Sequence, residues 1–189
     1  VAALFTPVGF GQSVRPVRAA ETGYRVGLIG HTGRGGFGHG LDSMWQNVPR
    51  TTVVGIADPA ASTASVASFK NRYSEAKFFS EYRQMLEEIR PDLVAIGTRY
   101  IDQHAEMAIA AAHAGARGVY MEKPFVRTLE EADAVESACQ KTGIRLALAH
   151  RNRYHPVLPL VSEYLAAGKF GELLEIRARG KEDTRGGGL

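Results

Sequence analysis

Cysteine and long apolar runs are nearly absent from the sequence. Its 189 residues contain one cysteine, Cys139, so no disulfide can form within the chain, and this residue is expected to pack on the apolar side of a helix. No apolar run approaches the roughly 18 residues that a membrane-spanning helix needs. We therefore expect a globular protein of one full domain plus a remainder, with no membrane partner.

Charge of one sign does not dominate either. The 23 lysines and arginines are interspersed among 20 aspartates and glutamates, so the net charge of +3 does not indicate a nucleic-acid partner. The six histidines include no pair spaced for metal binding on one helix face, and motifs for a serine, cysteine or aspartate nucleophile are absent. The sequence therefore predicts no metal site.

The first 22 residues combine small residues, a short apolar run and two prolines without a clear period. We expect residues 1–22 to be either the remnant of an export signal, with a cleavage site at 17–19, or a flexible N-terminal extension. The two interpretations are equally compatible with the composition. The sequence is therefore compatible with a cytoplasmic or an exported protein.

The most informative stretch is a buried-strand pattern that ends in a cluster of glycines. The apolar run at 24–29 is followed by GHTGRGGFGH, whose glycines provide a turn where the backbone can approach a ligand closely. Apolar residues then recur at helical spacing and predict a helix whose N-terminus faces the turn: Phe37, Leu41, Trp45 and Val48. A strand, a glycine turn and a helix N-terminus together predict a site for a phosphate group.

The glycine spacing fits the dinucleotide-binding fingerprint imperfectly. Counted from Gly30, the pattern has Thr32 where a second glycine is expected, and then Gly35. A shifted frame of Gly30, Gly33 and Gly36 still provides a tight turn and close helix packing. Taken alone, the cluster is also compatible with an ordinary flexible loop.

Strand and helix patterns alternate through the rest of the first 150 residues. Further strands are predicted at 52–57, 76–79, 92–97, 118–121 and 144–149, with helices between them at 60–71, 81–90, 101–112 and 128–142. This alternation predicts an α/β fold with a doubly wound parallel sheet of the Rossmann type, a dinucleotide-binding domain at 23–150. Ligands of such sheets bind at the carboxyl ends of the strands.

The pattern changes after residue 150. A helix is predicted at 156–165 and a half-exposed strand at 173–178, which suits the beginning of a second, α+β domain at 151–189 that would bind the substrate.

Polar residues at the ends of two predicted strands are candidate site residues. Asp58 follows the second strand, where a carboxylate can accept hydrogen bonds from the adenosine ribose of NAD; the alternative is that it caps helix 60–71. No arginine or lysine lies at 59–69 to favour NADP. The fifth strand ends in Glu122-Lys123-Pro124, where charged groups are costly unless they have partners or a function.

The Glu-Lys-Pro sequence makes the chain resemble the Gfo/Idh/MocA family of NAD(P)-dependent sugar and polyol oxidoreductases, in which it marks the end of the fifth strand. The similarity covers about residues 24–189 and includes Asp58, His104, RYHP at 153–156 and AAGKFGELLEI at 166–176. The resemblance implies that Lys123 is the catalytic group, lying between the nicotinamide and the substrate, where it polarises the reacting oxygen.

The resemblance also assigns the cofactor site. It implies that Glu122 shapes the nicotinamide pocket and that His104 lines the cofactor or substrate cleft, with Lys123 between nicotinamide and substrate. The other cofactor-binding residues are then Gly30, Thr32, Gly33, Arg34, Gly35, Gly36 and Asp58. The alternatives are a surface ion pair between Lys123 and Glu122, and a solvated position at a helix start for His104.

The expected function is hydride transfer between NAD, rather than NADP, and a sugar, polyol or related cyclic alcohol. We expect a homo-oligomer when the protein is full length. In the family, a glycine-rich turn precedes a helix bearing an Asp and a His, and RGGGL at 185–189 resembles that turn without the residues that follow it, so this chain is expected to be incomplete for catalysis. Two rivals are an NAD-dependent glycoside hydrolase that oxidises its sugar transiently and a non-catalytic or truncated NAD-binding protein.

Overall fold

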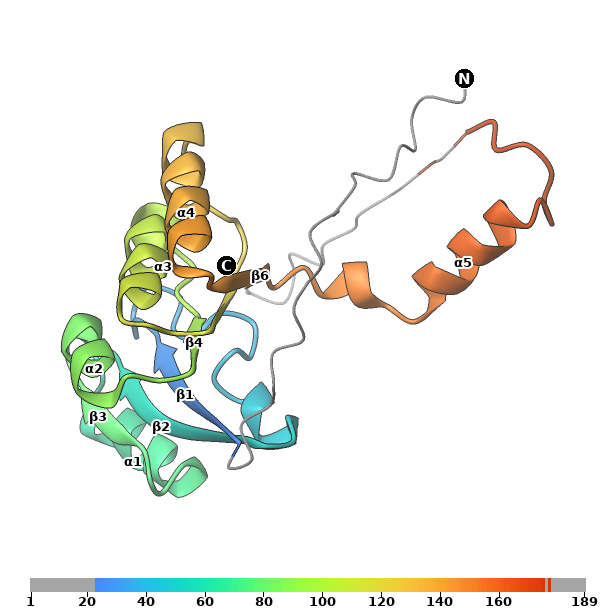
Figure 1. Cartoon of the computed structure of the whole chain (residues 1–189). Coiled ribbons are helices and arrows are strands. Elements are labelled where there is room, and N and C mark those ends of the chain that lie inside the picture. Colours follow the sequence, from blue (N-terminus) through green and yellow to red (C-terminus); the bar gives the residue numbers. More distant parts are fainter. Residues whose placement is uncertain (1–22, 176, 178–189) are drawn as a thin grey trace. The chain divides into compact units, whose positions relative to one another are not determined.

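The computed structural model describes residues 23–175 and residue 177 (Figure 1). The chain divides into two compact units between Ala149 and His150. The expectations for residues 1–22 and for the glycine-rich turn at 185–189 lie outside the described residues.

The first unit is built on a six-stranded parallel sheet, and the predicted α/β fold is confirmed. The strands are β1 (Tyr24–Ile29), β2 (Thr51–Ala57), β3 (Lys77–Phe79), β4 (Leu93–Ile96), β5 (Gly118–Met121) and β6 (Arg145–Leu148). Their order is β3-β2-β1-β4-β5-β6, which is the Rossmann-type doubly wound order. The direction of winding reverses between β1 and β4, so the carboxyl ends of these two strands mark the expected ligand crevice.

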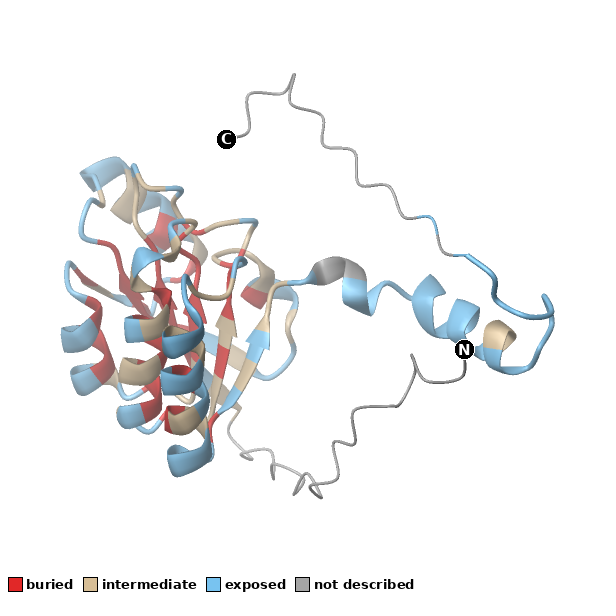
Figure 2. Cartoon of the chain, turned by 90° about the horizontal axis from the view of Figure 1, so that it is seen from above, coloured by how far each residue is buried: buried red, intermediate tan, exposed pale blue. Residues whose placement is uncertain are grey.

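Helices cover the sheet on both faces. They are α1 (Thr63–Arg72), α2 (Tyr82–Ile89), α3 (His104–His113) and α4 (Leu129–Thr142). Ile29, Ile96 and Met121 face a core shared with α2, α3 and α4, whereas Leu28 and Ile56 face a second core shared with α1 and the segment after β1. Figure 2 shows the buried residues on the strands and the inward sides of the helices. Strands buried on both faces explain the nearly continuous apolar runs in the sequence.

The helix predicted directly after the glycine cluster is wrong. Residues 31–43 form consecutive turns, and only a short 3-10 helix, η1 (Met44–Asn47), follows. The residues that gave the helical spacing are nevertheless buried, among them Phe37, Leu41 and Trp45. Gly38 and Gly40 adopt φ values of 63° and 87°, and this left-handed backbone interrupts an α-helix. The spacing of the apolar residues therefore predicted which side chains are buried but not the backbone conformation.

Three helix starts differ from the predicted ones. Helix α1 begins at Thr63 with Ser62 as its N-cap, so the alternative that Asp58 caps this helix is wrong. Helix α2 has Glu81 as its N-cap and begins at Tyr82, one residue after the predicted start. The predicted helix at 101 begins as the 3-10 helix η2 (Ile101–Gln103) before α3 starts. Helix α4 matches its prediction: Thr128 Oγ1 accepts from the Glu131 amide at 3.2 Å, and Gly143 ends the helix.

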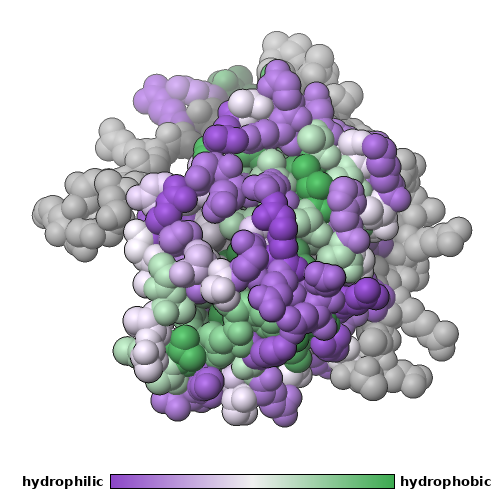
Figure 3. All heavy atoms as spheres, turned by 90° about the vertical axis from the view of Figure 1, so that its left-hand side faces the viewer, coloured by the Kyte–Doolittle hydropathy of each residue, from purple (hydrophilic) through white to green (hydrophobic). Residues whose placement is uncertain are grey.

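The outer surface of the first unit carries mixed charge. The face that includes α2 and α3 is mostly hydrophilic, with hydrophobic residues in separate groups (Figure 3). Opposite charges pair across it, as between Arg83 and Glu106 and between Lys77 and Glu88. The basic and acidic residues that are interspersed in the sequence thus form ion pairs on this surface.

The second unit contains η3 (Arg151–Tyr154) and α5 (Val157–Ala166), in agreement with the helix predicted at 156–165. Of the strand predicted at 173–178, the described residues 173–175 and 177 form no strand, and the others lie outside the description. Across the described part of the chain, no helix combines the length and the apolar character needed to cross a membrane.

Candidate cofactor and catalytic site

A cavity of about 280 Å³ lies at the carboxyl ends of β1, β2 and β3. Its lining includes the glycine turn and the residues that follow the next two strands: Gly30, Arg34, Ala57, Pro59, Ser80 and Tyr82. The cavity therefore occupies the side of the switch point where the adenosine half of a dinucleotide binds in doubly wound sheets.

The glycine turn is closed by its own backbone. The amide of His31 donates to the Gly36 carbonyl and the amide of Gly36 donates to the His31 carbonyl, both at 3.0 Å. Within the described part of the chain the amides of Gly33 and Gly35 have no hydrogen-bond partner, and a Cβ added at Gly33 or Gly36 would meet nothing within 4 Å. Free amides beside open space fit an anionic group, although no helix N-terminus supports them.

Asp58 ties the second strand to this turn. Its carboxylate is 3% exposed and accepts from the Thr32 amide at 3.0 Å, from the Thr32 hydroxyl at 2.5 Å and from the Ala60 amide at 2.9 Å. Thr32, which replaces the second glycine of the fingerprint, thus has a structural role that glycine cannot perform. The structure brings Thr32 and Asp58, two predicted cofactor residues, together. The Asp58 carboxylate accepts its hydrogen bonds here from Thr32 and Ala60.

Arg34 connects the glycine turn to the segment after β4. Its Nη2 lies 3.0 Å from the Asp102 carboxylate, and its guanidinium stacks over the Tyr100 ring with 4.8 Å to the centroid. Both charged side chains are 40% exposed. An exposed ion pair of this kind contributes at most about 1 kcal/mol, so Arg34 can exchange Asp102 for a phosphate at small cost.

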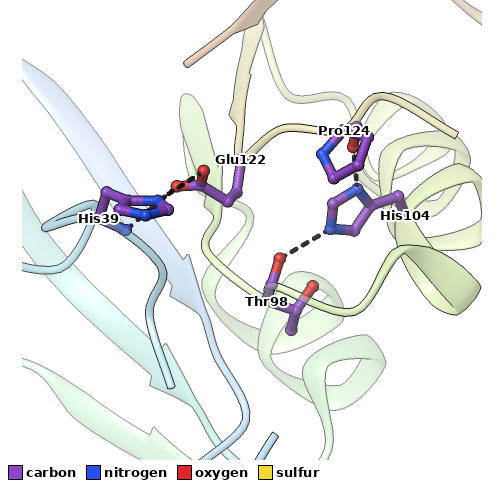
Figure 4. Close-up of polar contacts among 5 residues, drawn as sticks. All are labelled: His39, Thr98, His104, Glu122 and Pro124. Carbon is purple, nitrogen blue, oxygen red and sulfur yellow. Dashed lines mark hydrogen bonds and ion pairs between the residues drawn. The ribbon is translucent and has the colours of Figure 1, made fainter. Parts of the chain in front are cut away.

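Glu122 follows β5 and points back toward the loop after the glycine turn (Figure 4). Its carboxylate is 1% exposed, lies 2.9 Å from Nδ1 of His39, and accepts from the His39 amide at 3.1 Å. No ion pair joins Glu122 to Lys123 in the described residues, so the alternative of a surface ion pair between them is wrong. His39 is a partner that the sequence did not reveal.

Lys123 is exposed, in contrast to its buried neighbour Glu122. It follows β5 directly, and its peptide bond to Pro124 is cis. Among the described residues its ammonium has no ion pair or hydrogen bond. A cation at the carboxyl end of an interior strand can stabilise negative charge on a bound ligand.

His104 is fully buried at the start of α3, so the alternative of a solvated helix-start residue is wrong. Its Nε2 lies 2.8 Å from the Thr98 carbonyl, and its Nδ1 lies 2.9 Å from the Pro124 carbonyl (Figure 4). The ring therefore joins the segment after β4 to the segment after β5. Both ring nitrogens face backbone carbonyls, so in this structure the ring holds these two segments in position.

Tyr82 is a second residue that the sequence did not single out. It lines the cavity, and burial raises the pKa of its hydroxyl to about 12. The buried hydroxyl has no hydrogen-bond partner among the described residues. Its position at the start of α2, on the apolar face, gave only a packing signal in the sequence. No cluster of three metal-ligating side chains occurs in the described residues.

Comparison with known proteins assigns the first unit to a family. Residues 24–150 match the model of the Gfo/Idh/MocA oxidoreductase family, NAD-binding Rossmann fold. The chain belongs to this family. The resemblance carried by Glu122-Lys123-Pro124 is thereby confirmed for the first unit, and NAD(P) binding is a property of the matched domain.

Relatives in the family act on sugars and inositols. Levoglucosan dehydrogenase of Pseudarthrobacter phenanthrenivorans is 32% identical over 138 residues, covering 72% of this chain and 33% of the relative. The scyllo-inositol 2-dehydrogenase (NAD(+)) of Bacillus subtilis is 26% identical over 148 residues, covering 78% and 42%. The chain thus spans about a third to two fifths of the length of these relatives.

A solved structure of similar fold was determined with NADH bound. The WlbA dehydrogenase from Bordetella pertussis, in complex with NADH and UDP-GlcNAcA, is 26% identical with a TM-score of 0.65. The match covers 80% of this chain and 42% of that one.

Proposed function

We propose that this chain is the nucleotide-binding part of an oxidoreductase that transfers a hydride between NAD and a carbinol carbon of a sugar, polyol or related cyclic alcohol. Residues 23–150 form its dinucleotide-binding domain, and residues 151–189 begin its substrate domain. The observation that carries the proposal is the exposed ammonium of Lys123 at the end of β5, which has no ion pair among the described residues and follows the buried Glu122.

The cofactor, when bound, supplies the hydride acceptor. The glycine turn offers the free amides of Gly33 and Gly35 and the Arg34 guanidinium to its phosphates. Asp58, at the end of β2, disfavours a 2′-phosphate by its charge, so NAD is preferred over NADP. Two relatives support this preference, one named for NAD(+) and one solved with NADH.

Lys123 acts on the substrate oxygen. Its ammonium donates a hydrogen bond to that oxygen and stabilises the alkoxide character that develops as the hydride leaves the carbon. A charged ammonium has no lone pair, so it cannot accept the hydroxyl proton while it performs this role. A separate proton acceptor is therefore required, and we place it in the substrate domain.

The direct test is an NADH assay on the protein encoded by the complete reading frame, with a panel of sugars, inositols and acyclic polyols. Steady NADH accumulation with at least one cyclic alcohol is expected, with NAD favoured over NADP. Product release from a glycoside without NADH accumulation would instead identify the glycoside hydrolase, because that reaction regenerates its cofactor. Tight NAD binding without either activity would identify a non-catalytic protein. The expected homo-oligomer is checked in the same preparation by light scattering.

A further inference from the structure

Both carboxylate oxygens of Glu122 are engaged by a single residue, His39. The ring Nδ1 lies 2.9 Å from Oε1, and the backbone amide donates to Oε2 at 3.1 Å (Figure 4). The carboxylate is 1% exposed, whereas the His39 side chain is 46% exposed. The loop after the glycine turn thus covers a buried carboxylate, with the outer part of the imidazole in solvent.

The backbone before His39 is shaped for this contact. Gly38 has a φ of 63°, and a Cβ at this position would lie 2.5 Å from Glu122 Oε2 and 2.8 Å from the Gly97 carbonyl. Only glycine allows the loop to pass so close to the carboxylate. The contact therefore depends on two successive residues of the loop.

The contact with His39 determines which donors the Glu122 carboxylate faces. A buried carboxylate is costly without partners, and the nearest cation in sequence is Lys123. Lys123 has no ion pair in the described residues, and the donors to Glu122 come from His39. An ammonium neutralised by an adjacent carboxylate would be poorly available to a substrate oxygen.

We propose that His39 is a positioning residue of the reaction centre. By holding both oxygens of Glu122 toward the glycine-turn loop, it keeps this carboxylate from pairing with Lys123 and leaves the ammonium free for the substrate oxygen. The reaction-centre part of this inference rests on the proposed function, whereas the pairing of Glu122 is measurable without any turnover.

The test uses competitive acylation of lysines in this chain, followed by mass spectrometry. An ammonium paired with a carboxylate gives up its proton less readily and therefore reacts more slowly. His39→Leu removes the ring donor at nearly constant size, and we expect Lys123 acylation to slow about threefold or more. His39→Asn keeps an N–H near the position of Nδ1, so its rate should match the parent. The exposed Lys141 on α4 is the internal control.

The effect must depend on Glu122. In a Glu122→Gln background, His39→Leu should no longer change Lys123 acylation. An unchanged rate in His39→Leu, or an equal decrease in the Glu122→Gln background, would overturn the inference. If His39→Leu fails to fold by circular dichroism, Gly38→Ala provides the second variant, because its Cβ displaces the loop from the carboxylate and should slow Lys123 in the same way.

Turnover separates this inference from the proposed function. In the protein encoded by the complete reading frame, His39→Leu should lower kcat with little change in KM for the substrate, and His39→Asn should restore kcat. Parental turnover in Lys123→Met would overturn the proposed function while leaving the acylation result intact.

Discussion

Thr32 and Asp58, 26 residues apart in the sequence, are joined through both the backbone and the side chain of the threonine. The Thr32 amide lies 3.0 Å from each carboxylate oxygen, and its hydroxyl donates to Oδ2 at 2.5 Å. The carboxylate proposed for the ribose thus also fixes the turn proposed for the phosphates. A change at either residue is expected to affect both halves of the cofactor site.

The first prediction concerns Asp58→Ala. A hydrogen bond to a charged group contributes roughly 1.5–3 kcal/mol, so losing the carboxylate should weaken NAD binding by tens-fold or more. Calorimetry on this chain measures the dissociation constants of NAD and NADP for the parent and the variant. Tighter binding of NADP than of NAD by the parent would contradict the role given to Asp58.

Thr32→Val tests the connection between the two residues. The valine keeps the size of the side chain and the backbone amide but loses the hydroxyl that donates to Asp58. We expect NAD binding to weaken about fivefold, in the range of one lost hydrogen bond. In the Asp58→Ala background the same change should have little further effect, because the two residues act as a unit. Tighter NAD binding by Thr32→Val would show that Thr32 competes with the ribose for Asp58.

Lys123→Met tests the catalytic group. Methionine keeps much of the stem volume and removes the charge, so turnover of the protein encoded by the complete reading frame should fall ~100-fold or more. The dissociation constant of NAD should change modestly, because the ammonium acts on the substrate oxygen. Stopped-flow or steady-state NADH measurements decide the question. Turnover above about a tenth of the parental rate would exclude the role.

His104→Leu tests the buried imidazole. Because a neutral imidazole donates from one ring nitrogen, the substitution leaves one of the carbonyls of Thr98 and Pro124 without its donor, at a cost of about 1–3 kcal/mol. Urea unfolding of this chain should show a lower free energy of unfolding by that amount. His113→Leu, at the exposed end of α3, is the matched control and should change stability by less than about 0.5 kcal/mol. Equal stability of the two variants would show that the His104 bonds contribute nothing.

Cys139 provides a test of packing by pH. Burial, together with the nearby Glu136, raises the pKa of its thiol above the usual value of 9.0. Since the thiolate is the reactive form, the native protein should react with Ellman's reagent more slowly at pH 8 than the same chain in urea. The rate should rise as the pH is increased. Equal rates for the native and the unfolded chain would show that the Cys139 thiol is not buried in the native protein.

The sequence alone was sufficient for the parallel sheet, and it predicts the edge of the sheet at which a ligand binds. Parallel strands buried on both faces need nearly continuous apolar runs, and the helices between them need apolar residues at a period of 3.6. The alternation of strands and helices can therefore be predicted from short stretches of sequence. The carboxyl ends of such strands meet at one edge of the sheet, so the alternation by itself predicts that Asp58 and Lys123 lie at that edge. The family resemblance added the expected catalytic role of Lys123.

Only the tertiary structure decided the partners of these residues. Hydrophobic spacing at 37–48 records which side chains are buried, and both a helix and a chain of turns satisfy it; the left-handed glycines selected the turns. The pairs Arg34–Asp102 and His39–Glu122 join segments 68 and 83 residues apart, and such contacts arise from the strand order, which no local pattern encodes. Burial of the Glu122 carboxylate then required donors, and the fold supplied them from the glycine-turn loop, because that loop lies across the carboxyl ends of β4 and β5.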